Sequence, residues 1–188
     1  MIIGVTGSIA SGKSILTSFL KERGFIYLTL SKFLKDIAAQ RNIPIERKNL
    51  QDLGNKLREE EGNEVLAKYV VEEIKNNNYV NVVIESIRNP FEIRYLKNNL
   101  SGFYLISFEA LKEIRFNRVL ERKNPIDPKT WEDFVKIDDR DQGIGESESG
   151  QGVKQCIDLS DYHIINDDSL ENTIDKINKI YNELLHIS

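Results

Sequence analysis

Eight residues near the N-terminus decide the fold of this chain: Gly7-Ser8-Ile9-Ala10-Ser11-Gly12-Lys13-Ser14. They match the pattern G-x-x-x-x-G-K-[ST] at every fixed position, and this pattern is typical of loops that bind the phosphates of a nucleotide. We call residues 7–14 the phosphate loop. Every residue in it is a candidate nucleotide ligand, and the rest of the chain is interpreted outward from it.

The residue types of the phosphate loop suit this chemistry. A polyphosphate must meet several backbone N–H groups at once, and Gly7 and Gly12 let the backbone turn tightly enough for that. Lys13 can then reach the β- and γ-phosphates as a point charge, and the Ser14 hydroxyl is placed to bind Mg²⁺ at the start of the following helix. ATP and Mg²⁺ are therefore the expected cofactors, with Lys13 catalytic and Ser14 as the metal ligand.

The flanking segments fit a phosphate loop, which should leave a buried strand and enter a helix. Residues 1–5 form an apolar, β-branched run, which predicts a strand. After the loop, apolar residues recur at helical spacing until Gly24 supplies a helix stop; they are Ile15, Leu16, Phe19 and Leu20. This context disfavours the alternative, a Gly/Ser-rich turn that only resembles a phosphate loop.

Composition indicates one ordinary soluble domain. The chain has 188 residues, 40% of them hydrophobic, which is enough for one large core without a second domain. A formal net charge of −4 shows no basic excess, so long nucleic acid is not an expected partner. The only cysteine, Cys156, cannot form an intrachain disulfide and is expected in a helix core, and no run approaches the ~20 apolar residues that span a bilayer. We expect a cytoplasmic protein with no membrane partner; its oligomeric state stays open.

Short apolar runs alternate with helical patterns along the chain. Strands are expected at residues 1–5, 25–30, 79–85, 103–108 and 162–166, each followed by a helix. Because parallel neighbours need crossover connections, this alternation predicts a mostly parallel five-stranded sheet with helices on both faces, a doubly wound, three-layer α/β fold. Four-helix and all-β folds conflict with the alternation.

Two segments stand out within this single domain of residues 1–188. Residues 31–75 hold three helical patterns, the last two separated near Gly62, and we interpret them as an insertion that binds the phosphoryl acceptor. Residues 123–152 contain two prolines, four glycines, many acidic residues and one short amphipathic piece around Trp131. Their composition suggests a mobile lid.

Separated arginines are expected of a phosphoryl transferase, because the reaction is catalysed mainly by positioning and by neutralising charge. Arg115, Arg118 and Arg122 lie in one predicted helix that leads into the lid, and Arg140 lies at the far side of the lid. Taken singly, each would be read as a surface arginine. Their shared position around the lid favours a catalytic role for Arg118, Arg122 and Arg140.

A second basic group borders the expected acceptor side: Lys35, Arg47, Arg58 and Arg88. Arg88 closely follows the predicted strand that ends on Glu85, at the carboxyl edge where ligands bind in open α/β sheets. We predict that Lys35, Arg58 and Arg88 bind the acceptor. Glu85 either organises water around Mg²⁺, orients the acceptor, or is a plain surface acid at a strand end.

Asn166 ends the last predicted strand, just before Asp167-Asp168-Ser169. It either contacts the base of the nucleotide or only starts the turn, and the sequence does not separate these readings. The two histidines, His163 and His186, have no triad or metal partner nearby in sequence and are expected to be structural.

With these residues in view, the chain resembles the P-loop kinases of the nucleoside monophosphate kinase and dephospho-CoA kinase group, and most closely an uncharacterised archaeal branch of nucleotide kinase-like proteins. The similarity covers nearly the full length and includes residues 4–14, 53–59, 83–90, 115–122 and 161–166. It implies a P-loop kinase fold and ATP-dependent phosphoryl transfer to a small nucleotide-type acceptor. Only the first of these motifs is specific for nucleotide triphosphate binding.

Two departures from the family patterns bear on the acceptor. Dephospho-CoA kinases carry an aspartate pattern after the second strand, where this chain has Leu28-Thr29-Leu30-Ser31, and monophosphate kinases have aspartate where this chain has Glu85. A phosphate acceptor arrives ionised and needs no base, whereas a hydroxyl acceptor benefits from one. The missing acid therefore favours a nucleoside or deoxynucleoside monophosphate as acceptor.

Two alternatives stay open. Dephospho-CoA kinase activity is the first, because Asp36 or Glu85 could act as the base. The second is a regulatory module that binds a nucleotide without catalysis, although such a switch has little use for the three lid arginines together. The sequence does not distinguish ATP from GTP as donor, nor does it name the base or sugar of the acceptor.

Overall fold

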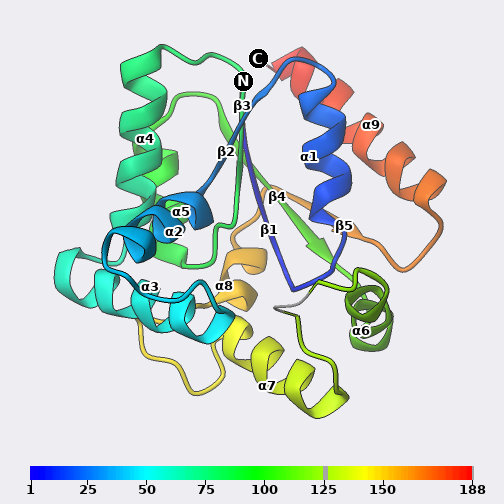
Figure 1. Cartoon of the computed structure of the whole chain (residues 1–188). Coiled ribbons are helices and arrows are strands. Elements are labelled where there is room, and N and C mark those ends of the chain that lie inside the picture. Colours follow the sequence, from blue (N-terminus) through cyan, green and yellow to red (C-terminus); the bar gives the residue numbers. More distant parts are fainter. Residues whose placement is uncertain (125–126, 188) are drawn as a thin grey trace.

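The structure is a computed structural model and describes residues 1–124 and 127–187 (Figure 1). Within these ranges five strands form one sheet in the order β2-β3-β1-β4-β5, and every neighbouring pair is parallel. The strands are β1 (Ile2–Gly7), β2 (Ile26–Thr29), β3 (Val82–Glu85), β4 (Phe103–Glu109) and β5 (Tyr162–Ile165). The predicted doubly wound α/β sheet is confirmed, and its described pairings are all parallel.

Helices connect the strands and continue past the last of them. They are α1 (Lys13–Lys21), α2 (Leu30–Gln40), α3 (Arg47–Glu61), α4 (Val65–Asn77), α5 (Pro90–Asn99), α6 (Lys112–Glu121), α7 (Trp131–Gln142), α8 (Val153–Asp158) and α9 (Leu170–Ile187). Gly62 ends α3 with a φ of 102°, as its place between two helical patterns predicts. The predicted acceptor-binding insertion, residues 31–75, therefore corresponds to α2, α3 and α4. The predicted lid, residues 123–152, contains α7.

The sheet lies between two helix layers (Figure 1). Helices α1 and α9 pack on one face, and α4, α5 and α8 pack on the other. Side chains of β1 alternate between the two cores: Ile2 joins the core under α4 and α5, while Ile3 and Val5 join the core under α1 and α9. Both faces of the parallel sheet are therefore buried, which explains its continuous apolar runs.

Two predicted strands begin later than the sequence suggests. Residues 79–81 follow the end of α4 and precede β3, because Asn78 adopts a left-handed φ of 53° and Tyr79 donates its N–H to the carbonyl of Ile74 at 3.1 Å. Phe25 likewise donates its N–H to Leu20, so β2 starts at Ile26. In both places hydrogen bonds of the preceding helix end outcompete the β-branched pattern.

Helix α7 gives the proposed lid a defined structure. Its Phe134 is fully buried in a small cluster with Ile9 of the phosphate loop and Val119 of α6, and Phe116 and Trp131 pack against that cluster. Trp131 meets Phe116 edge-on, with ring centroids 5.3 Å apart. Lid mobility stays a prediction, and residues 125–126 of that segment lie outside the described residues.

Cys156 is fully buried in α8, as expected of a helix core residue, and burial raises the pKa of its thiol well above the ordinary value. Among the described helices, none is both long and apolar enough to cross a membrane.

Candidate functional site

The phosphate loop joins the carboxyl end of β1 to α1. Gly7 has a φ of 135°, and a Cβ there would lie 2.1 Å from the carbonyl oxygen of Phe108. Gly12 has a φ of 101°, and a Cβ there would lie 2.0 Å from Nδ2 of Asn166. Both positions therefore require glycine, for conformation and for space.

Lys13 lies folded back over the phosphate loop. Its ammonium Nζ donates to the carbonyls of Gly7 at 2.8 Å and Ser8 at 2.7 Å. Burial and the nearby charge of Arg88 together lower the pKa of this ammonium to about 7, against the opposing effect of Glu85. The charged form of Lys13 is therefore unfavourable at this place in the protein, and the negative charge of a phosphate would stabilise it.

Asn166 braces the phosphate loop from behind. Its Nδ2 donates to the carbonyl of Ser11 at 2.9 Å, and its Oδ1 accepts from the Thr173 hydroxyl at 2.8 Å. Arg118 donates to the Asn166 carbonyl at 3.0 Å, so these two predicted site residues meet beside the loop. The Asn166 amide is engaged at both ends by the protein, and its contact with a nucleotide stays a prediction. Nη1 of Arg118 is buried and has no hydrogen-bond partner among the described residues, which leaves a donor for a ligand.

Ser14 presents an exposed hydroxyl on the first turn of α1. In the described part of the chain, no group of three or more His, Cys, Asp or Glu side chains could hold a metal ion. A hard cation would therefore be held by the Ser14 hydroxyl, water and the phosphates of a nucleotide, which is how Mg²⁺ commonly binds in such sites. The donor set fits that ion.

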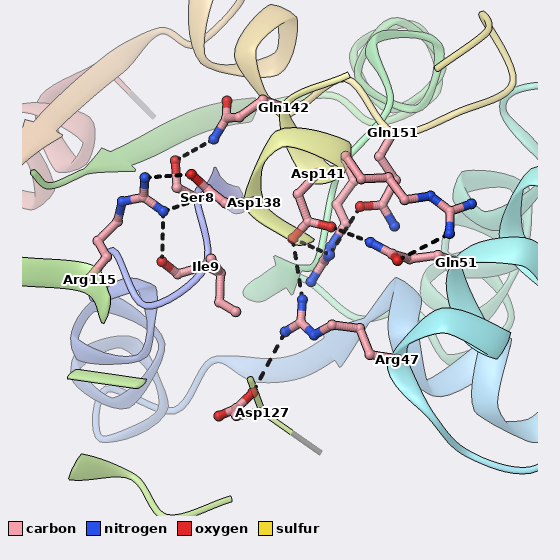
Figure 2. A network of polar contacts seen from close by, with 12 residues as sticks. Ser8, Ile9, Arg47, Gln51, Arg115, Asp127, Asp138, Asp141, Gln142 and Gln151 are labelled. Carbon is pink, nitrogen blue, oxygen red and sulfur yellow. Dashed lines mark hydrogen bonds and ion pairs between the residues drawn. The ribbon is translucent and has the colours of Figure 1, made fainter. Parts of the chain in front are cut away.

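Helix α7 is tied to the phosphate loop by two contacts (Figure 2). Asp138 accepts two hydrogen bonds from the guanidinium of Arg115, at 2.6 and 2.9 Å, and Arg115 also donates to the carbonyl of Ile9 at 3.3 Å. Gln142 donates to the Ser8 hydroxyl at 2.8 Å. Arg115 therefore acts as a brace between the loop and α7.

A third α7 residue, Asp141, contacts side chains of α3 (Figure 2). It accepts from Arg47 at 3.3 Å, from Arg88 at 3.2 Å and from Gln51 at 2.7 Å, and its side chain is 2% exposed. Sequence reasoning missed Asp141, because an acidic run in a Gly- and Pro-rich segment reads as solvated surface. The available signal was helical spacing: Phe134, Asp138 and Asp141 recur on one face of α7.

Next to Asp141 lies a cavity of about 160 Å³, which we call the arginine pocket. Helices α2 and α3, Leu66 of α4, the connection between β3 and α5, and the segment before α8 all contribute to it. Its lining consists of Leu30, Ser31, Leu34, Lys35, Arg47, Leu50, Gln51, Gly54, Arg58, Leu66, Ser86, Arg88 and Gln151. The three predicted acceptor ligands, Lys35, Arg58 and Arg88, therefore lie in one cavity.

The arginines of the pocket differ in how far the protein already engages them. Arg58 is 4% exposed and donates through Nε and Nη2 to one oxygen of buried Glu92, at 3.2 and 2.8 Å. The other Glu92 oxygen accepts the N–H groups of Arg88 and Asn89 at the start of α5. Arg88 is 29% exposed, and only its Nη1 donates to described side chains, those of Asp141 and Gln151. Arg58 thus has a structural partner, while Arg88 keeps donors available.

Glu85 ends β3 and lies close enough to Lys13 to affect its pKa. One of its carboxylate oxygens accepts the Tyr27 hydroxyl at 2.5 Å, and burial together with this contact raises the pKa of Tyr27. The next residue, Ser86, has a left-handed φ of 68°, an uncommon conformation for serine that aims the chain into the arginine pocket. Thr6 fixes this turn by donating to the carbonyl of Ile87 at 2.8 Å.

The remaining predicted residues have protein partners or lie apart. Arg140 pairs with Asp52 of α3 and with Glu146, each at 2.8 Å, so it joins α7 to the helices of the insertion. Arg122 pairs with Asp127 at 3.0 Å. The exposed Asp36 is not among the residues that line the arginine pocket. The catalytic roles of Arg122 and Arg140 stay predictions.

His163 has partners that its sequence position did not reveal. Its Nδ1 contacts the Ser107 hydroxyl at 2.8 Å and its Nε2 lies 3.0 Å from a carboxylate oxygen of Glu109. Ser107 is fully buried between β4 and β5, so its hydroxyl is not available as a nucleophile. The arrangement joins two neighbouring strands and agrees with a structural role.

The sequence of the chain has known relatives. Residues 3–142 match the family model described as an AAA domain. A UPF0200 protein of Hyperthermus butylicus is 31% identical over 171 residues, which cover 91% of this chain and 88% of that protein.

Solved structures share the fold at low sequence identity. TT1252 from Thermus thermophilus gives a TM-score of 0.65 at 19% identity, covering 98% of this chain and 97% of that chain. Shikimate kinase from Bacteroides thetaiotaomicron gives a TM-score of 0.58 at 13% identity, covering 98% of each chain. The chain therefore has the three-layer P-loop kinase fold, and by its sequence it belongs to the UPF0200 proteins and, over residues 3–142, to the family of AAA domains.

Proposed function

We propose that this protein transfers the γ-phosphoryl group of Mg–ATP to a nucleoside or deoxynucleoside monophosphate. The observation that carries the proposal is the lining of the arginine pocket, which holds four basic side chains and, among the described residues, no carboxylate. Such a wall suits an acceptor that is already an anion. It does not suit a hydroxyl acceptor, which benefits from a base.

The charge of the pocket supports a phosphate monoester. Glu92 offsets one of the four positive charges through Arg58, and Asp141 offsets another through its contacts with Arg47 and Arg88. Asp127 lies 3.9 Å from Arg47 but is shared with Arg122. The pocket therefore keeps a net positive charge, which suits a phosphate anion. Arginine suits this task because its planar guanidinium can donate two parallel hydrogen bonds to one phosphate.

Each group has a defined part in the proposed reaction. An oxygen of the acceptor phosphate forms the new bond to the γ-phosphorus while the bond to the β–γ bridging oxygen breaks, and ADP leaves. Lys13 and the loop N–H groups hold the β- and γ-phosphates, and Arg118, whose buried Nη1 has no partner among the described residues, is the candidate to donate to them. Mg²⁺ held through Ser14 would neutralise charge on these phosphates. Because the acceptor oxygen is ionised, no proton has to be removed.

The alternative acceptor, the hydroxyl of dephospho-CoA, has less support. Of its two candidate bases, Glu85 already accepts the Tyr27 hydroxyl, and Asp36 is exposed outside the pocket lining. Asp141, which lies behind the arginines, is engaged by three donors.

A coupled ADP-release assay tests the proposal. Purified protein with Mg–ATP is given a panel of nucleoside and deoxynucleoside monophosphates, dephospho-CoA, or no acceptor, and GTP replaces ATP in a parallel series. We expect at least one monophosphate to accelerate ADP release well above the rate without acceptor. Acceleration by dephospho-CoA alone would transfer the assignment to the second candidate. Tight nucleotide binding without stimulation by any acceptor would identify a regulatory module.

A further inference from the structure

Besides its cations, the arginine pocket has an apolar half. Leu30 and Leu34 come from α2, Leu50 from α3 and Leu66 from α4, and all four line the same cavity. Apolar side chains do not stabilise a phosphate. They do stabilise the flat ring of a nucleobase, because ring and leucines are both removed from water when they pack together. If the pocket takes the acceptor, the apolar half is therefore the place for its ring.

The size of the cavity limits that ring. Its volume of about 160 Å³ is shared by the basic and the apolar parts of the pocket, and an apolar protein cavity of about 150 Å³ is known to hold one benzene molecule. The space left for a base beside the phosphate is therefore at most that of one six-membered ring with small substituents. A fused two-ring purine would have to push the leucines apart, which packed interiors resist.

We propose that the pocket selects acceptors with a single ring, that is, pyrimidine nucleoside or deoxynucleoside monophosphates over purine ones. This inference rests on the proposed function and adds to it the class of base. It also assigns a role to Gly54, the one pocket-lining glycine, as the residue that keeps the ring space open.

Gly54 lies in the interior of α3, where glycine is less favourable than alanine. A Cβ at this position would lie 3.4 Å from Nη1 of Arg58 and 3.6 Å from Cδ2 of Leu34, which are ordinary van der Waals contacts. Neither backbone conformation nor packing therefore requires glycine here, in contrast to Gly7 and Gly12. A side chain at position 54 would instead take up part of the cavity that Gly54 lines.

These facts give opposite expectations for stability and for acceptor use. Gly54→Ala should raise Tm by about 2–4 °C, because it removes an unfavourable glycine from a helix. The same methyl should lower kcat/KM for pyrimidine monophosphates several-fold, and Gly54→Leu should lower it at least about 100-fold. The KM for ATP should stay within about twofold of wild type in both variants. Lys48→Ala, an exposed change on the same helix, serves as the control for both readouts.

The experiment measures kcat/KM at saturating Mg–ATP for CMP, UMP, dCMP and dTMP against AMP, GMP and dGMP, and we expect at least a tenfold pyrimidine preference. In parallel, isothermal titration calorimetry without ATP measures binding of CMP and AMP to wild type and both Gly54 variants. Equal use of both classes, or wild-type activity in Gly54→Leu, overturns the inference and leaves the kinase assignment standing. Gly54-dependent CMP binding without transfer to any acceptor supports the pocket and overturns the proposed function. Loss of both transfer and Gly54-dependent binding overturns both, and folding of each variant is verified by its Tm.

Discussion

The phosphate loop and the arginine pocket are near each other, since Arg88 and Arg47 of the pocket affect the pKa of Lys13, but they are assembled differently. Eight consecutive residues make the loop, and its turns depend on Gly7 and Gly12. The pocket takes its four basic side chains from α2, α3 and the connection between β3 and α5, and ion pairs with Glu92 and Asp141 fix the three arginines among them. A contiguous backbone motif tolerates few changes, whereas a distributed wall of side chains can change its specificity one residue at a time. This contrast orders the expected effects of mutations.

The largest loss of activity is expected on the loop side. Lys13→Ala should lower kcat about 100- to 1000-fold, because it removes the charge that the phosphate loop places for the phosphates of the donor. The fold should be kept, since burial of this ammonium is unfavourable without a nucleotide. Steady-state kinetics and circular dichroism measure the two effects, with the exposed Lys179→Ala as control. Full turnover in the variant would refute the phosphate-loop assignment.

Among substitutions in the arginine pocket, we expect the largest loss of stability at Arg58. Arg58→Met leaves the fully buried Glu92 without its cation, and breaking a buried ion pair in this way costs about 3–5 kcal/mol of unfolding free energy. Urea denaturation measures the loss. The double variant Arg58→Met/Glu92→Gln should recover a large part of it, because no unpaired charge is left. A single variant as stable as wild type would show that Arg58 is held for ligand binding rather than for the fold.

Arg88, in the same pocket, should behave in the opposite way. Arg88→Ala should lower kcat/KM for the acceptor at least about tenfold, since charge-assisted hydrogen bonds contribute roughly 1.5–3 kcal/mol each, while Tm and the KM for ATP change little. Arg88→Lys should rescue only in part, because it keeps the charge but loses the two-pronged geometry. If the ATP KM rises and the acceptor KM is spared, Arg88 serves the donor instead.

A smaller effect is expected at Asp141, which lies behind the arginines. Asp141→Asn keeps an acceptor for Gln51 but removes the charge that orients Arg47 and Arg88. We expect the acceptor KM to rise about threefold to tenfold with kcat nearly unchanged. The same chemical change at the exposed Asp158, on α8, should have no effect on either constant. A fall in kcat with unchanged acceptor KM would argue against a positioning role.

The smallest expected effect is the uptake of part of one proton when ATP binds. The Lys13 pKa is lowered to about 7 in the free protein, and phosphate binding should raise it toward its ordinary value, so binding takes up a fraction of one proton between about pH 7 and 9. Calorimetric titration with ATP in buffers of different ionisation enthalpy measures this uptake. The unfolded chain binds this proton more tightly than the free folded protein, so Lys13 makes stability rise with pH from about 7 to 10. Lys13→Met should lack both signals.

The contrast between the two sides also explains what the sequence could and could not predict. The alternation of strands and helices and the phosphate loop are local features. Their pattern in the sequence is therefore sufficient to predict them. Asp141 and Glu92 act through partners about 90 and 34 positions away, as the contacts with Gln51 and Arg58 show. No local pattern distinguishes such an acid from one that faces solvent.

Other differences have equally local physical causes. Strand β3 starts later than the sequence predicts, because Tyr79 completes the hydrogen bonding of α4. This hydrogen bond depends on the left-handed conformation of Asn78. Asn166 was recognised as a site residue, but its use as a brace for the loop needed the position of Thr173, seven residues later in another element. Cys156 was predicted correctly because an apolar helical face alone determines its burial.

The packing of α7 has a practical consequence. Its first residue, Trp131, is the only tryptophan of the chain, and it lies against Phe116 and Phe134 in the cluster that contains Ile9 of the phosphate loop. The same helix contacts the pocket arginines through Asp141. The unlabelled protein therefore carries its own fluorophore on the element that touches both the phosphate loop and the arginine pocket, and its emission can be followed in real time when ligands bind at either place.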